Sequence, residues 1–387
     1  MTTCFEFHLP TRIIFGDHSI QRAGEIASSM GRQALLVRGS GHVPLQPLTD
    51  QLRAAGISWV EYAVGHEPDV EVISAGLSLA KAAAVDHLIA FGGGSVMDTA
   101  KAIAALLTNP GELTDYLEVV GKGMPVDLPG LPLLAIPTTS GTGSEVTRNA
   151  VVSLEAPAVK VSMRGKGMGA KVALVDPTLT YSLPPNITAQ SGMDALTQVI
   201  EAYCSKNASP LTDAIALDGI LRGSRSILTA YRDGENSAAR EDMALTSLYS
   251  GIALSQAGLG AVHGFAGVLG AMVGAAHGAI CACLLPAVLK ANLGTALGQS
   301  HEPLIDKFRR MAEILSDGKS SEPDEVAIWA RTLCRKLHIP GLAELGVRRS
   351  DFPEIISRAA ASSSMQKNPF VLPPEILIQI LDESWSI

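Results

Sequence analysis

The stretch from Met243 to Leu289 constrains the fold more than any other feature, because it contains no Asp, Glu, Lys or Arg. Gly, Ser, Gln and two histidines, His263 and His277, interrupt it. It lacks the block of about 18 to 20 purely apolar residues that a bilayer-spanning helix needs. We therefore interpret it as buried core helices and expect no membrane partner. Polar groups inside such an interior need partners, so the two histidines require an explanation.

A second apolar segment, from Ser191 to Tyr203, offers a partner for these histidines. Asp194 and Gln198 lie four residues apart in it, which puts both side chains on one face of a helix. A carboxylate and two imidazoles suit a divalent transition metal such as zinc or iron(II). We interpret Asp194, His263 and His277 as metal ligands and Gln198 as a fourth. The alternative is a capping Asp and two core histidines with ordinary hydrogen-bond partners.

Length and composition limit the domain organisation and the partners. A chain of 387 residues is too long for one ordinary core, which favours two domains. With 47% hydrophobic and 18% charged residues, a large interior or an oligomer interface is expected, and we predict a homodimer or larger homo-oligomer. A net charge of −8 without a basic cluster argues against nucleic acid as a partner. Five cysteines without C-x-x-C spacing, and an N-terminus without a signal-peptide pattern, predict reduced thiols and a cytoplasmic location.

Strands and helices alternate in the first half of the chain. Apolar residues at helical spacing predict a helix over 69–84, and after about Pro185 long Ala- and Leu-rich segments predict helices only. The sequence thus predicts an α/β domain with a parallel sheet over 1–185 and an all-helical domain over 186–387. Short apolar runs predict the strands, over 33–38, 87–91, 131–136 and 172–175.

Two of these strands run into turns that suit a nucleotide. The turn from Gly92 to Ser95, with Asp98 close behind, opens a helix, where glycines let the backbone approach a phosphate and the helix N-terminus favours an anion. The hydroxyl-rich turn from Thr138 to Thr147 offers donors to a ribose, a phosphate or the nicotinamide amide. The first turn is neither a G-x-G-x-x-G nor a P-loop, and it could be a tight turn without a ligand. Together they predict a nucleotide crevice.

A series of motifs runs along nearly the whole chain: Pro10 to Gly16, Glu67-Pro68, Gly92 to Ser95 with Asp98 and Lys101, Pro137 to Glu145, Asp176-Pro177, Ser191 to Leu196, His263-Gly264, His277-Gly278 and Asn368-Pro369. In these motifs and their order the chain resembles the iron-containing (group III) alcohol dehydrogenase family. The resemblance implies a Rossmann-like N-terminal domain that binds NAD or NADP and an all-helical C-terminal domain that supplies a divalent metal. It also implies a cleft between them, where hydride passes between the cofactor and a small-molecule alcohol or aldehyde.

The resemblance also assigns individual residues to the two sites. Asp194, His263 and His277 match three of the family's metal ligands, and no further side chain is assigned a catalytic role. The implied cofactor site comprises Gly93, Gly94, Ser95 and Asp98 in the first turn, Thr138, Thr139, Thr142 and Ser144 in the second, and Lys160.

Two positions depart from the family pattern. The family usually has His where this chain has Gln198, and a second His where it has Gly267. An amide oxygen is a weaker and harder donor than an imidazole, so the site has either three protein ligands plus water and substrate or a loose fourth protein ligand. This makes iron less certain, and the metal could be Fe2+ or Zn2+. Gly267 leaves room for a bulkier substrate or for a water that takes part in proton transfer.

The choice between NAD and NADP depends on the residue that follows the strand predicted over 33–38. NAD-selective relatives often carry an acidic residue there, whereas this chain has Gly39, flanked by Arg38 and Ser40. We include Gly39 and Ser40 in the cofactor site. Without the repelling carboxylate NADP(H) becomes admissible, and Arg38 could pair with its extra phosphate. The alternative is that Arg38 is a solvated strand-end charge.

Three functions remain open from the residues and the resemblance. The favoured one is a metal-dependent NAD(P) alcohol dehydrogenase or aldehyde reductase. The second is a metal-free reductase of an activated keto acid, similar to maleylacetate reductase, although such relatives usually lose the residue that matches Asp194. The third is lyase chemistry like that of dehydroquinate synthase, which the absence of Lys and Arg from Met243 to Leu289 disfavours.

Overall fold

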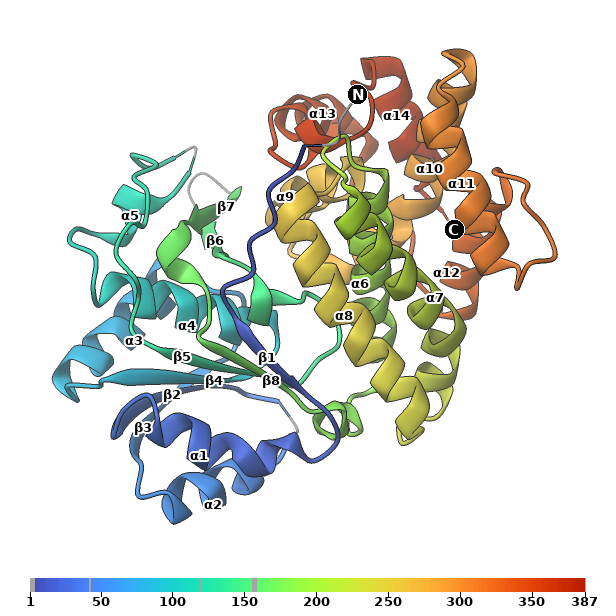
Figure 1. The fold of residues 1–387 in the computed structure, drawn as a ribbon. Coiled ribbons are helices and arrows are strands. Elements are labelled where there is room, and N and C mark those ends of the chain that lie inside the picture. Colours follow the sequence, from blue (N-terminus) through green and yellow to red (C-terminus); the bar gives the residue numbers. More distant parts are fainter. Residues whose placement is uncertain (1–3, 42, 119, 155–158, 387) are drawn as a thin grey trace. The chain divides into compact units, whose positions relative to one another are not determined.

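The computed structural model describes residues 4–41, 43–118, 120–154 and 159–386, which form two compact units (Figure 1). One unit comprises His8–Leu183, and the other begins at Pro184 and includes the N-terminal residues up to Phe7. The division between them falls beside the predicted boundary at residue 185. The grouping of the first residues with the helical unit differs from the predicted assignment.

The first unit is built on a six-stranded sheet in which every neighbouring pair is parallel, in the order β1-β8-β5-β4-β2-β3. The predicted α/β class is therefore confirmed, and the four predicted strands correspond to β2, β4, β5 and β8. The strands are β1 (Arg12–Phe15), β2 (Gln33–Gly39), β3 (Ser58–Val64), β4 (His87–Gly92), β5 (Leu133–Pro137) and β8 (Val172–Val175). The helices are α1 (Ala23–Ser28), α2 (Gln46–Ala54), α3 (Val70–Ala82), α4 (Gly94–Leu106) and the single turn α5 (Leu113–Tyr116).

Both faces of this sheet are covered, which explains its continuous apolar strands. Leu35 and Val37 of β2 pack in a cluster with residues of α3 and α4, whereas Ala34 and Leu36 pack in another with residues of α1 and α2. Figure 1 shows α1 and α2 below the sheet and α3 and α4 above it. Successive side chains of a strand point to opposite faces, so each central strand must be apolar at every position.

The strands that the sequence pattern missed lie at edges. β1 and β3 are the two outer strands of the sheet, and their residues are mostly exposed or half-buried, with Glu61 in the middle of β3. An antiparallel pair, β6 (Asn149–Leu154) and β7 (Val159–Arg164), was also missed. Half-exposed strands lack the continuous apolar run by which the buried strands were predicted.

The described residues of the second unit form helices joined by turns and loops and contain no strand, in agreement with the predicted all-helical class. Its core contains apolar residues from nearly all of its helices, among them fully buried residues on α6 and α10. The helices are α6 (Pro185–Cys204), α7 (Pro210–Arg232), α8 (Ser237–Ala257), α9 (Ala261–Val273), α10 (His277–Gly298), α11 (Glu302–Leu315), α12 (Glu325–Lys336), α13 (Phe352–Ala360) and α14 (Pro374–Glu383).

The uncharged stretch forms most of α8, all of α9 and the first half of α10. Within the described residues, α10 is long and apolar enough to cross a membrane, as are α8 and α9 taken together across a bend of 103°. In α10, however, 72% of the apolar window is buried inside the protein. Core helices have this property, and the packing agrees with the interpretation made from the sequence.

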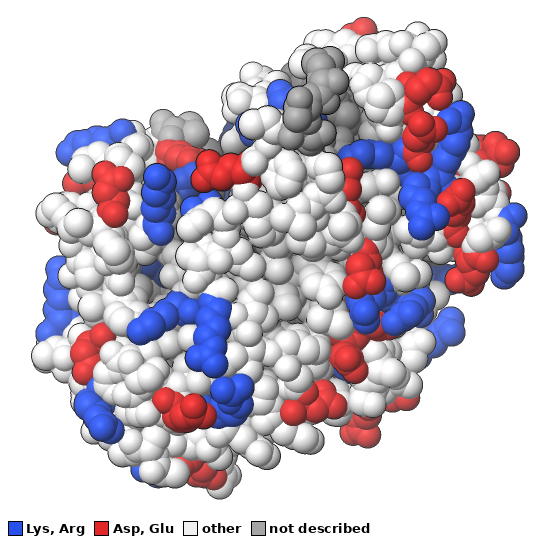
Figure 2. All heavy atoms as spheres, in the orientation of Figure 1, with Lys and Arg blue, Asp and Glu red and all other residues white. Residues whose placement is uncertain are grey.

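Charged side chains of both signs are interspersed over the face drawn in Figure 2. Several form short-range pairs on exposed helices, such as Arg309 with Asp306 at 2.6 Å. Exposed pairs of this kind contribute only about 0 to 1 kcal/mol each. On the drawn face, the described residues form no continuous basic surface of the kind that a nucleic acid requires.

Candidate active site

The strand order of the first unit creates a place for a nucleotide. The chain passes from β2 to β3 on one side and then returns to place β4 on the other side of β2. Ligands of open parallel sheets bind outside the carboxyl ends of the strands at such a reversal. Gly39 ends β2 and Ser40 follows it there, and Gly93, Gly94 and Ser95 follow β4. The structure thus brings two predicted parts of the cofactor site to one edge of the sheet.

Two glycines allow the turn after β4 to lie against the hydroxyl-rich turn after β5. A Cβ atom added at Gly93 would come within 3.2 Å of Thr139 Oγ1, and one added at Gly94 would come within 2.8 Å of Thr142 Cγ2. The second contact is closer than real Cβ atoms approach, so a side chain at residue 94 would push the turns apart. Thr138 directly follows β5 at the same edge and is buried.

A buried lysine joins these two turns. Lys101 on α4 is 2% exposed, and its Nζ donates to the Oγ of Ser144 at 2.6 Å and to Thr147 Oγ1 at 2.9 Å. It also lies 3.0 Å from Oδ1 of Asp98, which accepts from Ser144 Oγ at 2.5 Å. The second oxygen of Asp98 accepts from the backbone N–H of Val151 at 2.9 Å. Asp98 and Ser144, predicted as cofactor contacts, here hold the turns together.

The two cations predicted near the cofactor have carboxylate partners. Lys160 on β7 donates to Glu67 at 2.7 Å. Arg38 at the end of β2 donates from Nε to Glu61 on β3 at 2.9 Å. Either cation would have to leave or share its carboxylate in order to bind a phosphate.

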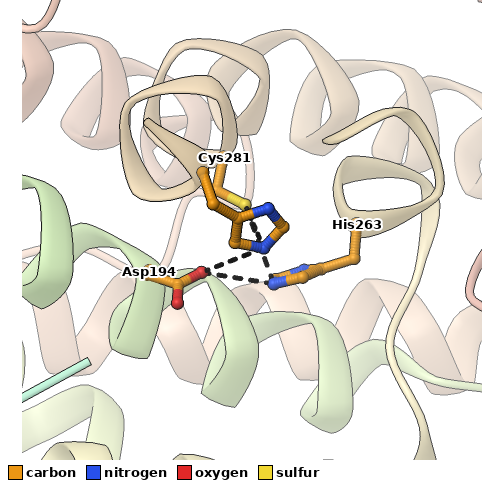
Figure 3. Close-up of side chains that lie close together, drawn as sticks. Asp194, His263 and Cys281 are labelled. Atoms are coloured by element: carbon orange, nitrogen blue, oxygen red, sulfur yellow. Dashed lines mark hydrogen bonds and ion pairs between the residues drawn. The ribbon is translucent and has the colours of Figure 1, made fainter. Parts of the chain in front are cut away.

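Three helices of the second unit bring the predicted metal ligands together. Asp194 lies on α6, His263 on α9 and His277 at the start of α10. The Oδ1 atom of Asp194 is 3.3 Å from Nε2 of His263 and 3.8 Å from Nε2 of His277. Figure 3 shows the side chains of Asp194 and His263 pointing toward each other and toward Cys281 of α10. The three predicted ligands therefore converge, and a fourth donor joins them.

Cys281 is that fourth donor, and the sequence interpretation had grouped it with the other reduced thiols. Its Sγ lies 3.6 Å from Nε2 of His277 and 3.7 Å from Nε2 of His263. One atom from each of the four residues lies within 4.8 Å of the others. The spacing of His277 and Cys281, four residues apart in one helix, is the sequence signal that would have identified it.

The electrostatics of the cluster suit a cation. Burial alone would raise the pKa of Asp194, but the hydrogen bond from His263 and the charges of both histidines lower it. Burial would likewise lower the pKa of His263, but Cys281, Asp194 and Glu201 raise it well above its ordinary value. Asp194 therefore favours its ionised form, while the two histidines favour protons that compensate its charge. A divalent cation would replace those protons, so the donor set fits the metal that the resemblance implies.

Glu201 orients one of the imidazoles, and the sequence interpretation missed it. It is buried on α6, and its Oε2 lies 2.6 Å from Nδ1 of His263. Its Oε1 accepts from the backbone N–H of Val262 at 2.7 Å, in the first turn of α9. A proton on Nδ1 leaves the lone pair of Nε2 directed at Asp194 and Cys281, which is the usual arrangement of a metal-binding histidine. The available signal was an acidic residue two helical turns after Asp194 in an apolar helix.

Replacing Glu201 with Gln is expected to weaken zinc binding about 10- to 100-fold, because an amide orients and polarises His263 less strongly than a carboxylate. Competition with a chromophoric zinc chelator measures the change. Glu354→Gln, at an exposed carboxylate paired with Arg358, is the matched control and should leave the affinity unchanged. Equal affinities in the two variants would show that Glu201 only stabilises the start of α9.

Gln198 does not join the four donors. Its Nε2 donates to Oδ2 of Asp194 at 3.0 Å, and its Oε1 accepts from Ser250 Oγ at 2.7 Å. Both ends of the amide are thus used, and they hold Asp194 so that Oδ1 faces the histidines. Gly267, the other departure from the family pattern, has open space where a side chain would start, since a Cβ added there meets no atom within 4 Å.

Comparison with known proteins gives consistent matches over both units. Residues 10–177 match the family model described as iron-containing alcohol dehydrogenase, and residues 188–385 match its C-terminal counterpart. Alcohol dehydrogenase 4 of Saccharomyces cerevisiae is 34% identical, with 100% of each chain covered. A crystal structure of a 1,3-propanediol oxidoreductase is 32% identical with a TM-score of 0.90, covering 99% of this chain and 100% of that one. Sulfoacetaldehyde reductase from Bifidobacterium kashiwanohense, solved with NAD+, is 25% identical with a TM-score of 0.85 and covers both chains fully.

Proposed function

The chain belongs to the iron-containing alcohol dehydrogenase family, and on that premise we propose that it interconverts a small or medium-sized alcohol and its aldehyde or ketone. It is an oxidoreductase, with NAD as the hydride carrier and a metal in the helical unit. Asp194, His263 and His277 are the proposed ligands of that metal.

The observation that supports this proposal best is the convergence of three protein donors from three different helices. Asp194, His263 and His277 are far apart in the sequence, yet their donor atoms meet in a largely apolar interior. A structural salt bridge would need one imidazole, not two. Glu201 behind His263 adds the outer carboxylate that metal-binding histidines usually have.

Each residue then has a definite task. A divalent cation, when bound, supplies Lewis acidity that polarises the substrate oxygen. Glu201 keeps the proton of His263 on Nδ1, and Gln198 holds Oδ2 of Asp194. The open space at Gly267 gives the substrate side chain room that a larger residue would fill.

The cofactor is held by the first unit in this proposal. The turn through Gly93, Gly94 and Ser95 receives the pyrophosphate, since the first N–H groups of α4 have no partner within the helix. Thr138, Thr139 and Thr142 offer hydroxyls beside it, and Lys101 keeps the second turn in place. These contacts involve backbone and hydroxyl groups, which suit any dinucleotide.

We propose NAD(H) as the preferred cofactor and NADP(H) as a weaker one. Gly39 presents no carboxylate that would repel a 2′-phosphate, which admits NADP(H). Arg38, however, is already paired with Glu61, so its charge is partly compensated. The proposed assembly is a homodimer or larger, which the low charged fraction of 18% supports.

The test combines metal analysis with an activity screen. Protein purified without chelator should hold about one divalent metal ion per chain. It should reduce aldehydes with NADH faster than with NADPH, and a chelator should abolish this reduction until metal is restored. Full activity on keto acids in metal-free protein would overturn the proposal and favour a metal-free reductase.

A further inference from the structure

The metal site contains a sulfur atom that the family's ligand set does not include. We propose that Cys281 is the fourth protein ligand, so that the site consists of Asp194, His263, His277 and Cys281 and selects zinc over iron(II). The inference rests on the proposed function and deepens it, because it identifies the metal and its protein ligands. The substrate oxygen would then bind as a fifth ligand, an expansion that zinc allows.

The distances between the donor atoms are those of a tetrahedral zinc site. Zinc bonds of about 2.0 to 2.2 Å to nitrogen or oxygen and 2.3 Å to sulfur place tetrahedral ligands about 3.4 Å apart, or about 3.6 Å where one is sulfur. Here Nε2 of His263 lies 3.3 Å from Oδ1 of Asp194, and Sγ of Cys281 lies 3.6 and 3.7 Å from the two Nε2 atoms. The distance from Nε2 of His277 to Oδ1 of Asp194 is longer, at 3.8 Å, and all four donor atoms lie within 4.8 Å of one another. The four donors thus surround a space of the right size for this ion.

Gln198 is the alternative fourth ligand, but both ends of its side-chain amide already form hydrogen bonds. Its amide nitrogen, which cannot bind a metal, faces Asp194 at 3.0 Å, while its oxygen accepts from Ser250. To coordinate a cation through that oxygen, Gln198 would have to rotate and lose its hydrogen bond to Asp194. Cys281 needs no such change.

The other buried cysteines show what an ordinary core thiol does in this unit. Cys283, two residues along α10, directs its Sγ at the backbone carbonyl of Ser384 at 3.6 Å. Cys334 donates to the carbonyl of Ala282 at 3.2 Å. Cys281 instead faces two imidazole nitrogens. This difference distinguishes a donor that belongs to the metal site from a thiol that only fills the core.

The ligand chemistry favours zinc. Thiolate with imidazole in a tetrahedral arrangement is typical of zinc, whereas iron(II) in non-heme sites usually takes two histidines and a carboxylate with open positions. Replacing an imidazole or amide donor by a thiolate therefore shifts the preference away from iron. The same chain with Ser at residue 281 would have a harder donor set and lose that preference.

Cobalt(II) is the probe that tests this assignment, because a cobalt–thiolate bond gives an intense near-ultraviolet charge-transfer absorption. The full-length protein, stripped of metal under reducing, oxygen-free conditions, is titrated with cobalt(II). We expect this absorption in the parent protein and in Cys283→Ser, and its loss in Cys281→Ser. Zinc affinity should fall in Cys281→Ser by more than the roughly 10- to 100-fold that loss of an outer partner costs.

Each of the other outcomes would contradict either the assignment of Cys281 as a ligand or the proposed function. Cobalt binding by the parent protein without the charge-transfer absorption would overturn the role of Cys281, whatever the variants do, while leaving a metal-dependent dehydrogenase intact. Retention of the absorption in Cys281→Ser would have the same meaning. Zinc loss in Gln198→Leu together with normal zinc binding in Cys281→Ser would assign the fourth ligand to Gln198. Failure to bind any divalent metal would instead contradict the proposed function itself.

Discussion

Replacing Asp194 with Ala is expected to lower kcat/KM for aldehyde reduction by at least about 10³-fold, because the Lewis acid is worth several kcal/mol and each 1.36 kcal/mol is a factor of ten. Asp194 supplies the carboxylate that faces both histidines. Without it, the remaining neutral imidazoles offset less of the charge of the cation. Bound metal per chain and steady-state kinetics, measured on the same preparation, check the prediction.

The matched control for this variant is Asp306→Ala, whose carboxylate is 67% exposed and paired only with a neighbouring arginine. It should keep the parent's metal content and activity. Far-ultraviolet circular dichroism should show both variants folded. If Asp194→Ala loses its metal but keeps its activity, the chemistry does not need the cation, and the keto-acid reductase hypothesis regains support.

Replacing Lys101 with Met is expected to destabilise the first unit by about 3 to 5 kcal/mol, because it removes one partner of a buried ion pair. Met retains the length of the side chain but none of its donors. Asp98 and Ser144 then lose the cation that holds them, and the two cofactor turns lose their link. Urea unfolding measures the stability, and fluorescence titration with NADH should show weaker binding.

The effect of Lys101→Met should also depend on pH through Glu145. Burial raises the pKa of Glu145 to about 7, and the charge of Lys101 lowers it. A raised pKa means that the folded state binds more protons than the unfolded chain, so this carboxyl weakens folding as pH rises from its ordinary value of 4.5 to about 7. Without Lys101 that interval extends to higher pH. The loss of stability should therefore be smaller at pH 5 than at pH 8.

Lys122→Met is the control, since Lys122 is 73% exposed and pairs with Asp115 at the surface of the same unit. It should change stability by no more than about 1 kcal/mol. A Lys101→Met variant as stable as Lys122→Met would mean that water replaces the buried amine without loss. The two turns would then owe their position to the glycine contacts alone.

The pattern of apolar residues predicted that the second unit is helical. It also predicted the central strands, because burial on both faces leaves a continuous apolar run. It missed β1, β3 and the β6–β7 pair, whose residues are half-exposed. An edge strand is held in place more by hydrogen bonds to its neighbouring strand than by burial of its own side chains. The positions of these strands therefore became clear only from the structure of the whole sheet.

The metal site, too, could be predicted only in part from the sequence. Spacing within one helix is readable from a sequence, so the pairing of Asp194 with Gln198 on one face of α6 was visible. Which of several donors meet across α6, α9 and α10 depends on the packing of those helices. The structure directs Gln198 back onto Asp194 and brings Cys281 and Glu201 to the histidines.

By itself, the order of residues determined the fold class and identified the candidate nucleotide turns and three metal-type donors, because each of these is recognised from local periodicity or from a motif within one segment. Only the tertiary structure decided which side chain completes the donor set and which residue orients His263. It also decided that Asp98 and Ser144 contact Lys101. Those roles depend on distances between segments that lie far apart in the chain. Helix and strand packing sets these distances to within an ångström, and no local pattern encodes them.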